Sequence, residues 1–325
     1  MPKSLRLLGH ALFLLSLALA TAWAATALWV QIAAPLVWLL WAALAATSLA
    51  AFSLHWRNPK ASWAVVAVAS LAIAGWYLSL QPRQDRDWSP DVAHNVTGEV
   101  NGNIASLHNI RNFRWTSASA AEERWEDRSY NLDEITSLDM FTSTWGNPNI
   151  AHLLVSFGFK DGQHLVYSVE IRKEQGEVFS SVGGFFRQFE IALIAATEED
   201  IVRVRTNRRG EDVQLFPIKL DPEKRRALFL IYLDYGNQLA AKPQFYNTVT
   251  ANCASTVYAL VKSIEPQMPL DSRLLFSGQL PEYIDELGGL EGEMPMAERR
   301  AKAATSAKAK AIPEGADFSS LIRTN

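Results

Sequence analysis

A long stretch without any Lys, Arg, Asp or Glu runs from Leu7 to Trp56, near the start of the chain. It is rich in Leu, Ala and Trp, and it is long enough for two helical membrane spans of about 20 residues each. Gln31 and Pro35 mark the expected turn between the two spans. A third apolar segment follows at 61–80, so the sequence predicts three transmembrane helices.

Basic residues orient these spans. Lys3 and Arg6 precede the first span, and Arg57 and Lys60 lie between the second and the third. The positive-inside rule keeps both clusters in the cytoplasm, so the chain after Gln81 is expected on the far side of the membrane. The first segment also fits a cleaved signal peptide, an alternative that leaves the orientation of the other two spans unchanged.

The chain is expected to have four parts. These are three transmembrane helices at 1–80, a juxtamembrane linker at 81–100, a folded extracytoplasmic domain at 101–291, and an Ala/Lys-rich tail at 292–325 that is expected to be disordered. The net charge of −3 with mixed acidic and basic residues argues against a nucleic acid partner. A single cysteine excludes an internal disulfide, so the domain must fold on its apolar core.

Alternating apolar residues, turn signals and helix caps predict the elements of the folded domain. The expected elements are one hairpin from His152–Phe159 and His164–Ile171, a second hairpin from Ile201–Thr206 and Asp212–Ile218, and two helices at Glu223–Leu239 and Cys253–Ile264. This order indicates an α+β domain with a mainly antiparallel sheet.

Cys253 is the candidate nucleophile because it follows Asn252, the predicted N-cap of a helix. The positive potential at a helix N-terminus favours the thiolate. In the first hairpin, a three-residue loop with Gly162 in a left-handed conformation places His152 opposite Glu170. We therefore predict His152 as the base of Cys253, with Glu170 orienting its imidazole.

Simpler interpretations of the same residues remain open. A lone cysteine at a helix start is often a small buried hydrophobe, and a lone histidine at a strand end is usually structural. His164 shares the face of His152 but lies roughly 20 Å away along the strand, so it is expected at the surface. No ligand spacing for a metal is present in the sequence, and no cofactor is implied.

Several segments, in order along the chain, carry a resemblance to a known family. They are Asn109–Trp115, Ala151–Phe159, Tyr167–Arg172, Thr197–Asp200, Arg203–Thr206 and Pro243–Cys253. Together they cover about residues 105 to 260, which is far more specific than any single motif. The region resembles the bacterial Lnb N-terminal periplasmic domain, a family associated with lipoprotein N-acyltransfer.

The resemblance implies a circularly permuted papain-like fold, in which the histidine strand precedes the cysteine helix. It implies a thioester route, with Cys253 taking an acyl chain from a phospholipid and passing it to an amine. Tyr246, Asn247 and Asn252, in the most specific segment, are expected to support the nucleophile. The implied location is the bacterial inner membrane with the domain in the periplasm, and the implied partners are membrane lipids and either lipoproteins or cell-envelope peptides.

The arrangement of the spans keeps two alternatives open. In the family's acyltransferases, membrane segments follow the periplasmic domain, whereas the three predicted spans precede it here. A thiol peptidase or amidase of the cell envelope would use the same three residues. A non-catalytic, membrane-tethered binding module would need none of them.

Overall fold

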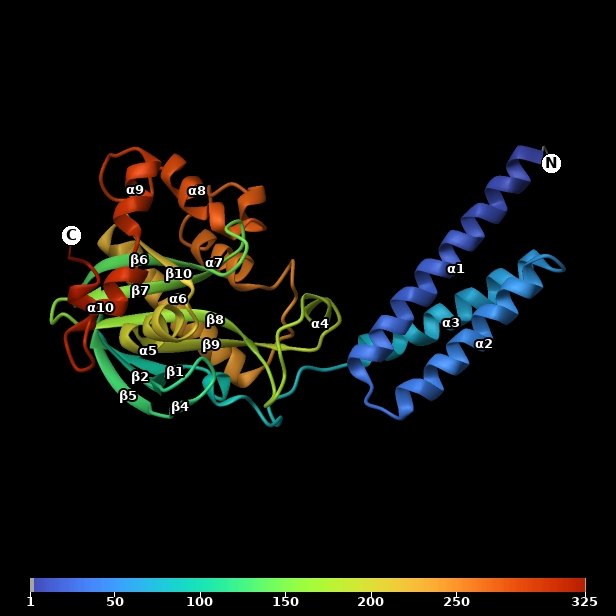
Figure 1. Ribbon diagram of the computed structural model, residues 1–325, viewed down its shortest axis with the longest axis horizontal. Helices are drawn as coiled ribbons and strands as arrows, with labels where there is room; N and C mark the ends of the chain where they lie inside the picture. Colours follow the sequence, from blue (N-terminus) through green and yellow to red (C-terminus); the bar gives the residue numbers. More distant parts are fainter. Residues whose placement is uncertain (1–2, 325) are drawn as a thin grey trace. The chain divides into compact units, whose positions relative to one another are not determined.

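The computed structural model describes residues 3–324, which form two compact units (Figure 1). The membrane unit contains the chain up to residue 82 together with Ser180–Gln188. The soluble unit contains 83–179 and the chain from residue 189 onward. Each unit is described by itself.

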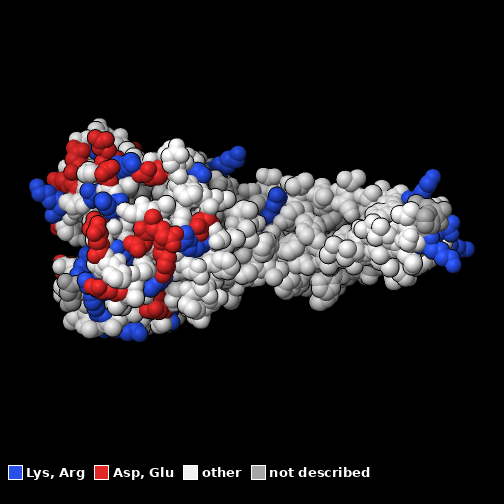
Figure 2. Space-filling model, turned by 90° about the horizontal axis from the view of Figure 1, so that it is seen from above, with Lys and Arg blue, Asp and Glu red and all other residues white. Residues whose placement is uncertain are grey.

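Three helices of the membrane unit are long and apolar enough to cross a membrane. They are α1 (Lys3–Gln31), α2 (Leu36–His55) and α3 (Pro59–Ser79). On the face drawn in Figure 2, most of the surface of these helices carries no charged side chain. The predicted three helices and the turn after Gln31 are confirmed.

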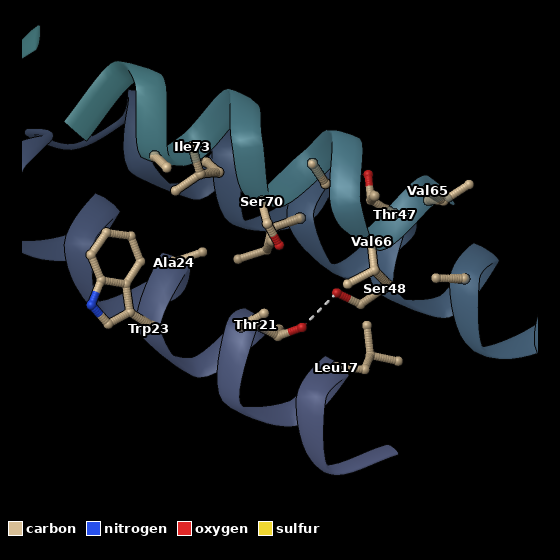
Figure 3. A pocket seen from close by; sticks show the side chains of 15 residues that line it. Leu17, Thr21, Trp23, Ala24, Thr47, Ser48, Val65, Val66, Ser70 and Ile73 are labelled. Carbon is tan, nitrogen blue, oxygen red and sulfur yellow. Dashed lines mark hydrogen bonds between the residues drawn. The ribbon is translucent and has the colours of Figure 1, made fainter. Parts of the chain in front are cut away.

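Side-chain hydrogen bonds link the three helices to one another. Thr21 of α1 and Ser48 of α2 share a hydrogen bond of 2.9 Å beside a hollow of about 330 Å³ (Figure 3). Ser62 of α3 donates to the carbonyl oxygen of Ala51 at 2.6 Å. Polar groups inside a bilayer must find partners within the protein, and these bonds satisfy that demand.

The soluble unit is built on an eight-stranded sheet whose order is β1-β2-β9-β8-β7-β6-β10, with β5 also paired to β2. Its strands are β1 (Thr97–Asn101), β2 (Ile104–Arg111), β5 (Trp125–Asn131), β6 (Ile135–Thr144), β7 (Ala151–Phe159), β8 (His164–Arg172), β9 (Glu190–Thr197) and β10 (Asp212–Pro217). β2 and β9 are parallel and the other neighbours are antiparallel. A separate short pair joins β3 (Arg114–Trp115) to β4 (Ala121–Glu122). The predicted α+β class with a mainly antiparallel sheet is confirmed.

Apolar layers cover both faces of this sheet. On one face, Phe157 and Tyr167 belong to a core that includes side chains of α6 (Pro222–Ala241), against which α7 (Cys253–Lys262) also packs. On the other face, Leu154 and Val166 share a core with α5 (Glu198–Arg203). Because side chains alternate between the two faces, β7 is buried along its whole length.

The predicted second hairpin is wrong. The segment expected as its first strand is helical, as α5 followed by the π-helical turn η3 (Val204–Arg208). The Thr197 side chain caps α5 by accepting from the Asp200 N–H, and acidic residues fill the first turn. A cap and negative charge at an N-terminus stabilise a helix, and here they prevail over the β-branched residues that suggested a strand.

The C-terminal residues also differ from the expected disordered tail. They form α9 (Met296–Ala303), α10 (Ser306–Ala311) and α11 (Phe318–Leu321), after α8 (Leu280–Glu286). Ile312, Phe318 and Ile322 join the apolar layer beside α5. These residues lie on separate short helices and turns. The sequence therefore has no continuous apolar stripe that would predict their burial.

The predicted linker is partly built into the soluble unit. Trp88, Val92 and Val96 are buried. The backbone N–H of Val96 donates to the carbonyl oxygen of Leu193 at 2.9 Å, and the backbone N–H of Arg83 donates to Glu190 at 2.9 Å. The soluble unit therefore begins at residue 83, well before the first strand.

Candidate active site

The hairpin of β7 and β8 sets the register of the site. Phe157 lies opposite Leu165, and Leu154 lies opposite Ser168. Gly162 has a φ of +85° in a three-residue loop, as the sequence predicts. The pairing ends at Leu154, and extending the same register by two residues sets His152 across from Glu170. The two side chains approach to 3.2 Å between Nε2 of His152 and Oε1 of Glu170. The predicted register is confirmed.

Cys253 is the first residue of α7 and is partly buried. A capping box fixes this helix start: the Asn252 side chain accepts from the Ser255 N–H, and the Ser255 hydroxyl accepts from the Asn252 N–H. The pairing of β7 with β8 ends at Leu154. The backbone of Leu153, the next residue along β7, lies beside the Cys253 thiol and lowers its pKa. The thiol therefore lies at the open end of the hairpin.

The contacts of His152 determine which of its ring nitrogens is available to Cys253. Its Nε2 lies 2.8 Å from Oγ of Ser168, and that hydroxyl donates to Oε1 of Glu170 at 2.7 Å. A hydroxyl that donates its only proton must accept from Nε2–H. Nδ1 is then the ring nitrogen that is available to Cys253, whose pKa His152 lowers. In the neutral ring Nδ1 carries a lone pair, so it can take the thiol proton.

The pKa shifts of His152 and Cys253 favour an ion pair between their side chains. Burial is the largest influence on His152 and lowers its pKa, but Glu170 and Cys253 together raise that pKa to about 9. Burial likewise raises the pKa of the Cys253 thiol, and His152 more than offsets this, so that pKa falls below its usual value. Both directions favour a thiolate beside an imidazolium at neutral pH.

Arg205 supports Glu170 from the other side. Its guanidinium lies 2.9 Å from Oε1 of Glu170 and 3.2 Å from Oε2 of Glu211. Burial would raise the pKa of Glu170, but His152 and Arg205 hold it well below the usual value. Arg205 belongs to the π-helical turn that the sequence predicts as a strand, so no signal identified it. The sequence could have identified Ser168, because it lies two residues from Glu170 on the same face of the strand.

The three expected supporting residues have different positions. Asn252 caps α7, as described above. Asn247 accepts from the N–H groups of Val249 and Thr250, so it shapes the turn before the helix. Tyr246 is buried, and burial together with the nearby Cys253 raises its pKa. The turn and the cap thus fix where the sulfur lies.

Backbone N–H groups at the start of α7 offer a site for negative charge. The N–H of Ser255 is taken by the Asn252 side chain, and that of Thr256 by the Asn252 carbonyl oxygen at 3.0 Å. The N–H groups of Cys253 and Ala254 precede these in the first turn, where a helix offers them no backbone acceptor of its own. An oxyanion that forms at a carbonyl attacked by the sulfur would lie in the positive field of this helix end.

An apolar cavity of about 530 Å³ lies along the same helix. Val257, Tyr258 and Val261 of α7 line it, together with Leu153 and Ala254, the chain neighbours of His152 and Cys253. Asp221 and Glu265 are among the polar residues that line it. Its size and apolar walls are typical of sites for small organic groups.

A second polar cluster lies on β6, β8 and α5. Ligand atoms of Asp139, His164 and Glu198 lie within 4.8 Å of one another, so His164 is not the surface residue that the sequence suggests. The Arg323 guanidinium approaches both carboxylates at 2.6 Å. A protein cation already neutralises this cluster, and the donor set does not favour a metal.

We expect Glu170→Gln to slow alkylation of Cys253 at about pH 6 by roughly tenfold or more, the effect of one pKa unit on a thiolate fraction. Glu170 raises the pKa of His152 and also raises that of Cys253 directly. The contact with His152 is the closer one, so its loss should dominate. The measurement is the alkylation rate against pH.

Glu199→Gln is the matched control, because Glu199 is 42% exposed and pairs with Arg203 outside the site. It should leave the profile unchanged. An identical profile for Glu170→Gln and the wild type would remove Glu170 from the proton chemistry of the site.

Comparison with known families identifies a family for the region that contains the candidate site. Residues 121–281 match the family model described as the Lnb N-terminal periplasmic domain. This part of the chain, the folded domain that carries the site, belongs to that family. The matched range contains His152, Ser168, Glu170 and Cys253. Neither the curated proteins nor the solved structures gave a match.

The Lnb domain therefore provides a periplasmic, membrane-associated part of the protein. The three apolar helices of the membrane unit provide its anchor. The family assignment rests on the whole matched range, and the arrangement around Cys253 rests on the contacts described above.

Proposed function

We propose that this protein is an inner-membrane cysteine enzyme that transfers acyl groups through a thioester on Cys253, with lipid or lipoprotein substrates. The observation that carries the proposal is the hydrogen-bonded chain of His152, Ser168 and Glu170 beside the Cys253 thiol, whose pKa His152 lowers. Such a chain activates a thiol by supplying both a base and its orienter. The fold that we propose to underlie it is the permuted papain-like arrangement of the family.

The first half-reaction begins with attack of the Cys253 thiolate on the carbonyl carbon of an ester. A C–S bond forms, the ester C–O bond breaks, and the imidazolium of His152 gives its proton to the departing alkoxide. The N–H groups at the start of α7 are placed to stabilise the oxyanion. The product is an acyl-thioester and a free alcohol.

The second half-reaction transfers the acyl group to an amine. The amine nitrogen attacks the thioester, a C–N bond forms and the C–S bond breaks. Nδ1 of His152 receives the amine proton, which restores the thiolate–imidazolium pair. Attack by water in place of the amine would make the same site a hydrolase.

The apolar cavity along α7 supports an acyl substrate. Leu153 and Ala254 connect its wall to the residues that flank the sulfur. The membrane anchor also favours a substrate that resides in the bilayer. A peptidase would more commonly need a polar cleft for peptide backbone groups.

The experiment is mass spectrometry of the full chain after incubation with phospholipid vesicles. The proposal predicts a mass increase of one acyl group on Cys253 that hydroxylamine removes. Addition of an amine-bearing lipopeptide should then discharge the adduct into an amide. Release only as free fatty acid would indicate a hydrolase, and absence of an adduct on any lipid tested would favour a binding module.

A further inference from the structure

The connection between β8 and β9, residues 173–189, has an exposed apolar part. The exposed fractions are 79% for Val178, 47% for Phe179, 44% for Val182 and 48% for Phe185. No Lys, Arg, Asp or Glu occurs from Val178 to Phe186. Large apolar side chains grouped on one exposed connection mark an interaction surface.

The middle of this connection packs with the transmembrane helices. Ser180–Gln188, which includes α4 (Ser181–Phe185), forms one compact unit with them. Gln31, the last residue of α1, donates to the Phe186 carbonyl oxygen at 2.6 Å. Arg187 donates to the carbonyl oxygen of Tyr77, near the end of α3, at 2.9 Å.

These contacts place the segment at a defined depth. α1 and α3 both begin on the cytoplasmic side by the positive-inside rule, so Gln31 and Tyr77 lie at their extracytoplasmic ends. The ring of Phe186 lies 5.7 Å from that of Trp23 and 6.5 Å from that of Tyr77. Trp and Tyr concentrate at the level of the lipid headgroups, so Ser180–Gln188 lies at the membrane–water interface.

We propose that Ser180–Gln188 is a membrane-inserted hook, in which Val182 and Phe185 enter the outer leaflet of the bilayer that the spans cross. Arg187 suits this depth, because its guanidinium lies 4.7 Å from the centre of the Tyr77 ring, at the level of the lipid phosphates. The partner is lipid because the exposed side chains continue the apolar surface of helices that are themselves in lipid.

The hook lies near the site in the sequence. It leaves the soluble unit at the end of β8, the strand that carries Ser168 and Glu170, and returns at β9. Seven residues separate Glu170 from Val178, so the strand of the site and the hook are close neighbours in the sequence. The contact of the hook with lipid does not depend on the proposed reaction.

The test uses the full chain with Cys253→Ser, so that a single new cysteine can be labelled with an environment-sensitive fluorophore. Val182→Cys and Phe185→Cys report on the hook, and both positions are already half-exposed, so the label should be tolerated. Lys160→Cys is the matched control, because it is exposed at the opposite end of the same hairpin. The proteins are reconstituted in phosphatidylcholine–phosphatidylglycerol vesicles.

We expect a doxyl group on the lipid acyl chain to quench the label at 182 and at 185, while iodide in the water quenches the label at 160 several times more strongly. Iodide quenching at 182 and 185 equal to that at 160 would overturn the proposal. Shielding from both quenchers would also overturn it, because it would indicate a protein partner. Neither readout requires catalysis, so the result is independent of the acyltransferase proposal.

Discussion

Replacing Cys253 by Ala is expected to abolish the acyl adduct and to lower turnover by about 10³-fold or more, since no other group in the site can form the thioester. Cys253 is the only cysteine in the chain, so no neighbouring thiol can replace it. The protein should remain folded, because the side chain is small and only partly buried. The measurement is acyl transfer from phospholipid to an amine by the full chain in vesicles.

The control for this variant is Ser263→Ala, a small change at the other end of the same helix. The Ser263 side chain is exposed and donates only to the Leu260 carbonyl oxygen at 2.6 Å. It should retain wild-type turnover. Activity in Cys253→Ala comparable to this control would refute the thioester route.

The second large effect is expected for Asp200→Asn, which should lower the free energy of unfolding of the soluble unit by about 3–5 kcal/mol. Asp200 is fully buried. Its two carboxylate oxygens accept from Arg111, from the Phe113 N–H at 2.8 Å and from the Trp115 indole at 2.7 Å. An amide group would direct its NH₂ at one of these donors and leave the buried Arg111 cation without its counter-charge.

The measurement for Asp200→Asn is the urea transition of the full chain in detergent micelles, followed by tryptophan fluorescence. Asp133→Asn is the matched control, because Asp133 is 56% exposed in its ion pair with Arg226 and should cost less than about 1 kcal/mol. Equal transition midpoints for the two variants would mean that the buried cluster does not hold β2 to α5.

Local patterns predict a large part of the candidate site. The period of two along β7 and β8, with Gly162 in the turn, is enough to place His152 opposite Glu170. Asn252 as an N-cap locates the start of α7 and hence Cys253. Both inferences use interactions between residues that are close in the sequence or paired across one short turn.

Contacts between distant segments could not be predicted in the same way. Arg205 reaches Glu170 only because η3 continues α5, where the apolar residues Ile201, Val202 and Val204 favour a strand when taken alone. Arg323 meets Asp139 across more than half of the chain, and nothing near either residue indicates the pair. Such tertiary pairs depend on the assembled fold.

The contact of the hook with the transmembrane helices could not be predicted from the sequence either. Hydropathy identifies the three spans because each is a continuous apolar helix. The apolar residues from Val178 to Phe186 are too few to register as a span, and their relation to Gln31 and Tyr77 emerges only in three dimensions. Ser180–Gln188, which lies between two strands of the soluble unit in the sequence, therefore belongs to the membrane unit.

The most direct test of the central claim is the pH dependence of Cys253 alkylation in the full chain, compared with His152→Ala. The account predicts that the wild-type thiolate persists well below the ordinary thiol pKa of about 8.5, because the imidazolium of His152, whose pKa is raised to about 9, stabilises it. In His152→Ala this low-pH reactivity should disappear. Profiles that coincide near the ordinary thiol pKa would contradict the account and leave Cys253 a structural residue.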